Sequence, residues 1–299
     1  LDIYGQLQAQ ALLAAAPAVL VALFARLYRT ALVAVVCAGA LAANLAPHLA
    51  MPPRVDAMSG ASAPLRLAWA NMRNWATGAN ALNRLLRVET PDIVLLTELT
   101  AHHQPAATAA AYPFRSSFPS GSAFDVLLMS RLRPVDMRFD YSFGSANPVM
   151  EARFCSIRGT TACLAIVALH ATRPALPAGF FGEPATRRDG MLALAASLAR
   201  RRLVAGDHVI LMGDFNATPY SLVFADMTSA SGLADSARAP SERPVRPRPT
   251  WLSIWPGVGL AIDHALISPG VRVVERRLGP NIGSDHRPLV LHFRLVDGI

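Results

Sequence analysis

Lysine is absent from this chain of 299 residues, so all 28 of its basic residues are arginine. Charged residues are also scarce, at 16%, whereas apolar residues make up 53%. This balance excludes a disordered chain, which combines low hydrophobicity with high charge. Three cysteines are too few for a small fold built on disulfides. The net charge of +8 permits an anionic substrate or a membrane surface as partner and does not choose between them.

Two long uncharged runs open the chain, from Ile3 to Ala25 and from Thr30 to Pro53. Each is long enough to cross a bilayer, which takes about 20 apolar residues. A secretory signal has one shorter apolar core behind a basic leader, and the chain has neither feature here. We therefore expect residues 1–51 to form a hairpin of two transmembrane helices. A buried helical hairpin within a soluble protein is the alternative.

The turn between these runs carries Arg26 and Arg29. Because cytoplasmic loops are enriched in basic residues, we expect this turn on the cytoplasmic side and the rest of the chain outside. The chain starts with Leu1 rather than methionine, so we expect a fragment of a longer protein. Residues 52–64 are rich in small residues and proline and are predicted to be a linker. Residues 65–299 are predicted to be one globular domain.

Four short apolar runs in this domain each end in a chemically versatile residue. Near-continuous apolar runs of this length favour strands that are buried on both faces. Helical patterns at Ala79–Glu89 and Arg187–Arg202 lie between them, and this alternation predicts layered α/β packing. The runs are Leu65–Asn71, Asp92–Glu98, Leu164–His170 and His208–Asp214.

An amide, two carboxylates and an imidazole at strand ends suit a hard cation and its substrate. Any one such ending is ordinary, since polar residues usually lie at element ends. Oxygen-rich ligands favour Mg²⁺, Mn²⁺ or Ca²⁺ over zinc. Two later segments add an acid next to a histidine, at Asp263-His264 and Asp285-His286. Such a pair can supply a ligand together with a proton-handling group whose tautomer a carboxylate fixes.

These motifs resemble the endonuclease/exonuclease/phosphatase superfamily, the DNase I-like metal-dependent phosphoesterases. The resemblance covers Leu65 to Leu295 and is carried by the order of four segments. With the apolar leader, the chain looks like a membrane-anchored bacterial subgroup, which places it in the bacterial cytoplasmic membrane with the catalytic domain on the periplasmic or extracellular side. The segments are 91–98, 213–219, 262–264 and 283–288.

The resemblance implies a four-layer α/β/β/α sandwich of two mixed sheets that binds Mg²⁺ or Mn²⁺. Asn71 and Glu98 would hold the cation, with Asp285 as a further ligand. The cation would bind a non-bridging phosphate oxygen and offset charge in the transition state.

The resemblance also implies a role for each remaining polar residue. Asp214 would deprotonate the attacking water, and Asn216 would hold that water or a phosphate oxygen. His170 and His286 would donate to the phosphoryl oxygens, and Asp263 would orient His286. This set serves in-line attack without a covalent enzyme intermediate, in which positioning and electrostatics supply most of the acceleration.

The predicted function is therefore that of a membrane-anchored phosphoesterase acting on phosphodiester or phosphomonoester bonds. The sequence does not decide whether the substrate is a nucleic acid, a phospholipid headgroup or a small phosphoester. Residues 124–131 lack the tyrosine that many nucleases of the family carry, which argues against an apurinic-site endonuclease. The alternative is a non-catalytic, membrane-anchored binding domain on the same fold. Membrane lipid is expected around residues 1–51, and no obligate protein partner is inferred.

Several other residues have two interpretations. Arg187 and Arg188 open a helix and either touch substrate phosphate or lie on a solvated face, the commoner case. Trp251 and Trp255 form either an apolar rim or ordinary packing. The proline-rich segment 239–250 is predicted to be an exposed loop.

Cys155 and Cys163 flank a turn centred on Gly159. In an antiparallel hairpin with this centre they lie opposite each other, close enough to form a disulfide. Such a bond persists in an oxidising compartment. Two reduced, packed thiols are the alternative, and Cys37, in the apolar leader, is expected to stay free.

Overall fold

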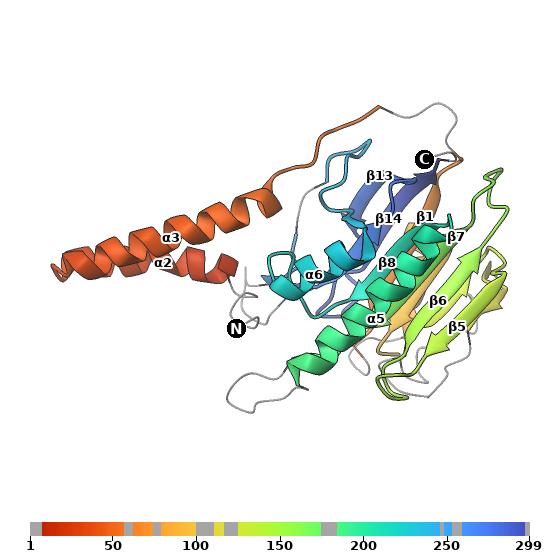
Figure 1. Cartoon of the computed structure of the whole chain (residues 1–299), viewed down its shortest axis with the longest axis horizontal. Helices are drawn as coiled ribbons and strands as arrows, with labels where there is room; N and C mark the ends of the chain where they lie inside the picture. Colours follow the sequence, from red (N-terminus) through yellow and green to blue (C-terminus); the bar gives the residue numbers. More distant parts are fainter. Residues whose placement is uncertain are drawn as a thin grey trace.

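A computed structural model describes most of the chain, and Figure 1 shows its arrangement. A sandwich of two sheets carries helices on its outer faces, and two N-terminal helices extend away from it. The described residues are 8–56, 62–73, 79–99, 111–116, 125–174, 184–245, 248–252 and 259–296.

The first sheet has six strands in the order β13-β14-β1-β2-β4-β3. Its central strands β1 and β2 are parallel, and the other pairs are antiparallel. The strands are β1 (Leu65–Asn71), β2 (Ile93–Thr97), β3 (Phe114–Arg115), β4 (Leu127–Ser130), β13 (Val271–Leu278) and β14 (Leu289–Leu295).

The second sheet also has six strands, in the order β5-β6-β7-β8-β12-β9. Here β7 and β8 form the parallel pair. The strands are β5 (Asp136–Asp140), β6 (Val149–Phe154), β7 (Leu164–His170), β8 (His208–Asp214), β9 (Ala234–Asp235) and β12 (Asp263–Ile267). A separate two-stranded ribbon pairs β10 (Trp251–Leu252) with β11 (Gly259–Leu260).

Three apolar clusters define four layers. The central cluster joins the inner faces of both sheets, with Trp69 and Leu95 from one and Ile166 and Met212 from the other. Helix α4 (Ala79–Glu89) covers the outer face of the first sheet. Helices α5 (Ala185–Val204) and α6 (Leu222–Ser231) cover the second. The predicted α/β/β/α sandwich of two mixed sheets is confirmed.

The two parallel pairs bring their carboxyl ends to one end of the sandwich. Asn71 is paired with Thr97 at the end of β1 and β2. His170 is paired with Asp214 at the end of β7 and β8. Because β12 runs antiparallel to β8, its first residue, Asp263, is paired with Asp214. Strand order thus gathers residues from distant parts of the sequence at one end.

The N-terminal runs form helices α2 (Gln8–Phe24) and α3 (Tyr28–Leu49), which pack together as a hairpin that projects from the sandwich (Figure 1). Among the described residues, Tyr28–His48 is the one helix long and apolar enough to cross a membrane, and Gln8–Phe24 is shorter. The alternative, a buried helical hairpin, does not match the structure. The apolar side chains of the α2–α3 hairpin are mostly exposed, and among its described residues only Ala22, Ala31 and Leu45 are buried.

The segment 239–250 was expected to be an exposed loop, and this expectation is wrong for several of its residues. Ser241, Val245 and Thr250 are buried. The hydroxyl oxygen of Thr250 accepts the backbone N–H of Asp263 at 3.0 Å, so the end of this segment packs against the start of β12.

The β6–β7 hairpin carries a disulfide between Cys155 and Cys163, whose Cα atoms are 4.2 Å apart. The ladder pairs Phe154 with Leu164, so the next residue on each side lies opposite the other. Gly159 has a φ of +86°, a left-handed conformation that glycine adopts without strain. The predicted bridge is confirmed, and Cys37 is free and exposed.

Replacing both bridged cysteines with serine should lower the free energy of unfolding by about 2–3 kcal/mol, because a short closed loop is released in the unfolded chain. Urea unfolding of the parent and of the Cys155→Ser/Cys163→Ser variant measures the loss. Cys37→Ser serves as the control and should unfold as the parent does. Equal stability of the parent and the double variant would contradict the bridge.

Candidate active site

A glycine allows the second sheet to bring two site residues together. A Cβ atom at Gly213 would lie 2.0 Å from the carbonyl oxygen of Leu169, so no larger residue fits between β7 and β8 there. This close approach immediately precedes the paired ends His170 and Asp214. Gly213 therefore has a packing reason to stand before the carboxylate in the Gly-Asp-Phe-Asn motif.

The carboxylate of Asp214 lies at the centre of the site. Its Oδ1 accepts the backbone N–H of Asn216 at 3.0 Å. Its Oδ2 lies 3.4 Å from Asn71 Nδ2, 3.6 Å from His170 Nε2 and 3.7 Å from His286 Nε2. Burial, together with the neighbouring Asp263 carboxylate, raises the pKa of Asp214 to about 8, against the opposing charge of His286.

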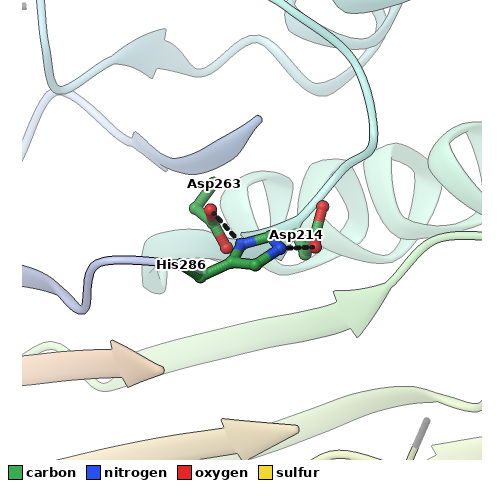
Figure 2. A group of neighbouring side chains, drawn as sticks. All are labelled: Asp214, Asp263 and His286. Carbon is green, nitrogen blue, oxygen red and sulfur yellow. Dashed lines mark hydrogen bonds and ion pairs between the residues drawn. The ribbon is translucent and has the colours of Figure 1, made fainter. Parts of the chain in front are cut away.

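A second buried carboxylate orients His286, as Figure 2 shows. Nδ1 of His286 lies 2.8 Å from Asp263 Oδ2, and the other ring nitrogen faces Asp214. The indole N–H of Trp69 donates to Asp263 Oδ1 at 2.8 Å. Burial alone would raise the pKa of Asp263, but His286 and the hydroxyl of Thr250 and the indole of Trp69 lower it below its usual value.

His170 and His286 differ in charge, because one ring is neutral and the other is protonated. Burial, reinforced by the charge on His286, lowers the pKa of His170 to about 3, so His170 is neutral. For His286, burial also opposes the charge, but the ion pair and hydrogen bond with Asp263 outweigh it and raise the pKa to about 10. Nδ1 of His170 lies 3.2 Å from the Thr97 hydroxyl oxygen, which holds the ring in place.

Asn71 and Glu98 form the oxygen-rich edge of the site. Asn71 Nδ2 donates to Glu98 Oε1 at 2.8 Å, and Asn71 Oδ1 accepts the Arg73 N–H at 2.9 Å. Burial raises the pKa of Glu98 despite the hydrogen bond from Asn71. Glu98 also has a φ of +52°, an uncommon conformation for a residue other than glycine that often marks functional sites.

Asp285 lies at the rim, where its carboxylate contacts Trp251 and Arg73. Its Oδ2 accepts the Trp251 indole N–H at 3.2 Å and lies 3.5 Å from Arg73 Nε. Trp251 thus has a polar partner beside the site, whereas Trp255 lies outside the described residues. The charge of Asp285 contributes to the raised pKa of Glu98, which places the two carboxylates within electrostatic reach of each other.

Arg188 supports Asn216 from within the protein. Asn216 has a φ of +45°, and its Nδ2 donates to the Ala171 carbonyl at 2.8 Å. The fully buried Arg188 donates to the Asn216 carbonyl at 3.2 Å and pairs with Asp189 at 2.7 Å. The solvated helix face expected for Arg188 is therefore wrong. Arg187 donates to the carbonyl of Phe143.

Among the residues that the structure describes, two sets of side chains are candidates to hold a cation. Asp214, Asp263 and His286 place ligand atoms within 4.8 Å of one another. The raised pKa of His286 keeps its ring positively charged, which disfavours a metal ligand there. Asn71 and Glu98 offer neutral and anionic oxygens without such a charge, and these suit a hard cation.

Three contacts of the site were missed by the sequence analysis, namely those of Trp69, Thr97 and Thr250. A usable signal existed for one of them. Trp69 lies two residues before Asn71, so both side chains are on the same face of β1, and a buried indole N–H usually needs a partner. Thr250 stood within a segment whose proline content suggested only exposure.

The buried neutral His170 should make folding weaken in acid. As the pH is lowered from 7 to 5, the unfolded chain protonates this histidine and the folded chain does not. The free energy of unfolding therefore decreases as the pH decreases. The contribution is about 2 kcal/mol over this range. Urea unfolding in EDTA should show that the free energy of unfolding of His170→Asn decreases between pH 7 and pH 5 by about 2 kcal/mol less than that of the parent. Parallel pH profiles would refute a neutral buried His170.

Comparisons with known proteins place this geometry in a family. The model of the endonuclease/exonuclease/phosphatase family matches residues 68–286, a range that contains every candidate site residue. No curated protein sequence matches the chain.

Several solved structures share the fold at low sequence identity. An endonuclease/exonuclease/phosphatase from Bacteroides vulgatus matches with a TM-score of 0.59 and 17% identity, covering 78% of this chain and 99% of that one. TDP2 from D. rerio complexed with a single-strand DNA product matches with a TM-score of 0.58 and 16% identity, covering 77% of this chain and 99% of that one. Sphingomyelinase C from Streptomyces griseocarneus matches with a TM-score of 0.55 and 17% identity, also covering 77% of this chain and 99% of that one. The family match extends over most of the sandwich, and the chain therefore belongs to the endonuclease/exonuclease/phosphatase family.

Proposed function

We propose that this chain is a membrane-anchored, divalent-metal-dependent phosphoesterase that hydrolyses phosphodiester or phosphomonoester bonds by in-line attack of water. The observation that carries the proposal is the environment of Asp214 Oδ2. This oxygen lies among Asn71, His170 and His286, at 3.4 to 3.7 Å from a nitrogen of each. A buried base next to donors from both sheets suits hydrolysis of an anionic ester.

The donor set fits a hard divalent cation, Mg²⁺ or Mn²⁺. Asn71 and Glu98 would hold it, with Asp285 as a further oxygen ligand at the rim. The raised pKa of Glu98 reflects a buried carboxylate that the hydrogen bond from Asn71 does not fully compensate. When bound, the cation would polarise a non-bridging phosphate oxygen and offset developing negative charge.

Asp214 acts as the general base in this proposal. Burial raises its pKa to about 8, so the deprotonated carboxylate is a stronger base than an ordinary aspartate. Because Oδ1 accepts the Asn216 N–H, Oδ2 is the oxygen left to face Asn71, His170 and His286. Asn216 holds the turn that fixes this carboxylate and helps to position the water.

The histidines supply donors to the phosphoryl oxygens. Neutral His170 donates from Nε2 in this proposal, and its Nδ1, 3.2 Å from the Thr97 hydroxyl oxygen, accepts from that hydroxyl. His286 donates as an imidazolium, which Asp263 orients and keeps charged. One neutral and one cationic donor stabilise charge on the transferred group without taking part in proton removal.

The α2–α3 hairpin serves as the anchor in this proposal. Its apolar side chains are exposed, for example Leu20 at 67% and Phe24 at 94%. With 22 residues, α3 is about 33 Å long, close to the thickness of a bilayer core. Arg26 and Arg29 favour a cytoplasmic turn, and the Cys155–Cys163 bond is compatible with an outer, oxidising side.

The catalytic part of the proposal predicts metal-dependent hydrolysis that EDTA abolishes. Glu98→Ala removes a proposed ligand and Asp214→Asn removes the proposed base, and each should lower kcat by about 10²–10⁴-fold. Rates on bis(p-nitrophenyl) phosphate and p-nitrophenyl phosphate, with Mg²⁺ and with Mn²⁺, measure this effect.

Asp226→Asn is the matched control for the base, since Asp226 is an exposed acid on α6. It should leave the rate unchanged. Parental rates in both site variants would show that the site is misassigned. No hydrolysis of any phosphoester by the parent would favour the non-catalytic binding domain.

The anchor predicts that the chain fractionates with membranes and that its C-terminus lies outside the cytoplasm. Alkaline phosphatase fused after Ile299 should be active, because it needs an oxidising compartment to form its disulfides. Green fluorescent protein at the same position should be dark after export by the general secretory route. The reverse pattern would overturn the orientation, and recovery of the chain in the soluble fraction would overturn the anchor.

A further inference from the structure

The base of the hairpin contacts the active-site end of the sandwich. At the start of α2, Gln8 Nε2 lies 3.4 Å from the Tyr220 carbonyl oxygen, and Gln10 Nε2 donates to the Gly259 carbonyl at 3.0 Å. At the end of α3, the His48 ring meets the edge of the Tyr220 ring, with centroids 6.0 Å apart. Both helices of the hairpin therefore contact the catalytic domain at the same place.

The two contacted segments belong to the site. Residues 215–221, which contain Tyr220, lead out of β8 directly after Asp214. Residues 259–262, which begin with Gly259, lead into β12 at Asp263. The hairpin thus lies against the two connections that carry the central carboxylates, at the end of the sandwich where the site is formed.

The position of the bilayer follows if the hairpin spans it, as in the proposed function. The far tip carries Arg26, and the near end carries the polar side chains of Gln8, Asn44 and His48. Asn44 Nδ2 donates to Gln8 Oε1, which joins the two helices at that end. Polar side chains at a helix end mark the boundary between hydrocarbon and water. The contacted loops then lie at the membrane surface.

Two exposed leucines adjoin these loops. Leu222 begins α6 directly after the Tyr220 loop and is 72% exposed. Leu252 lies in β10, is 44% exposed, and is paired with Gly259, the residue that Gln10 contacts. The backbone N–H of Leu252 donates to the Asp285 carbonyl at 2.9 Å, so this leucine is also next to the rim of the site.

We propose that Leu222 and Leu252 form a membrane-contact face that seats the active-site end of the sandwich on the bilayer, and that the substrate is a phosphoester in the headgroup of a bilayer phospholipid. This inference rests on the proposed function. Apolar side chains next to a membrane anchor gain burial in the lipid interface. A long nucleic acid would have to enter at the end that the anchor and the bilayer flank.

Hydrolysis at this surface needs only water as co-reactant. The water oxygen forms a bond to phosphorus while an ester P–O bond breaks. Asp214 takes a proton from the attacking water, the leaving oxygen takes a proton from a solvent water, and Asp214 then returns its proton to solvent. The lipid product stays in the bilayer, and the polar product leaves on the aqueous side.

The test uses the full chain reconstituted in vesicles of phosphatidylcholine, phosphatidylethanolamine and phosphatidylglycerol. Mass spectrometry of lipid products and of released headgroups gives the rate on bilayer lipid, and bis(p-nitrophenyl) phosphate gives the rate on a soluble ester. Leu222→Ser/Leu252→Ser should lower the lipid rate about tenfold, because apolar burial in the interface is lost. It should leave the soluble rate unchanged.

Val88→Ser/Val204→Ser is the matched control. Both valines are exposed, and they lie near the ends of α4 and α5, just before β2 and β8 begin and therefore at the end of the sandwich opposite the site. This control should keep both rates. Hydrolysis of the soluble ester without any hydrolysis of phospholipid, or equal lipid rates in the leucine variant and the parent, would overturn the inference alone. Absence of both activities would overturn the proposed function and the inference together.

Discussion

The buried carboxylate of Asp263 is the constraint on which the rest of the site depends. It lies in the second sheet, at the start of β12, yet its partners come from elsewhere: Trp69 in the first sheet, and His286 before β14. A charged group at this depth is stable only when it is paired and hydrogen-bonded. These bonds therefore fix how the two sheets meet at one end, and with that the position of His286 beside Asp214.

Different surroundings give two histidines of the site different charges. His170 Nε2 lies 3.6 Å from Asp214 Oδ2 and 3.8 Å from Glu98 Oε1, and burial keeps the ring neutral. His286 is also buried, but its bond to Asp263 keeps it charged. Environment, rather than residue type, decides which histidine carries a proton. Asp214 lies near both rings, and burial raises its pKa to about 8.

The hairpin and the site are one continuous structure at their junction. The helix ends contact the loops that leave Asp214 and enter Asp263, and the exposed Leu222 and Leu252 lie next to these loops. A hairpin joined only by a flexible linker would allow the domain to face in any direction. These contacts instead relate the direction of the site to the axis of the hairpin.

The sequence by itself determined those features that depend on neighbouring residues. Apolar runs set the bounds of β1, β7 and β8, with Asn71, His170 and Asp214 at their ends, and the turn at Gly159 set the register that opposes Cys155 and Cys163. Only the tertiary structure decided the burial of Arg188 and Thr250, the charge states of the two histidines and the docking of the hairpin. The physical reason is distance along the chain: Trp69 and Asp263 are separated by 194 residues, and their hydrogen bond exists only once two sheets have packed face to face.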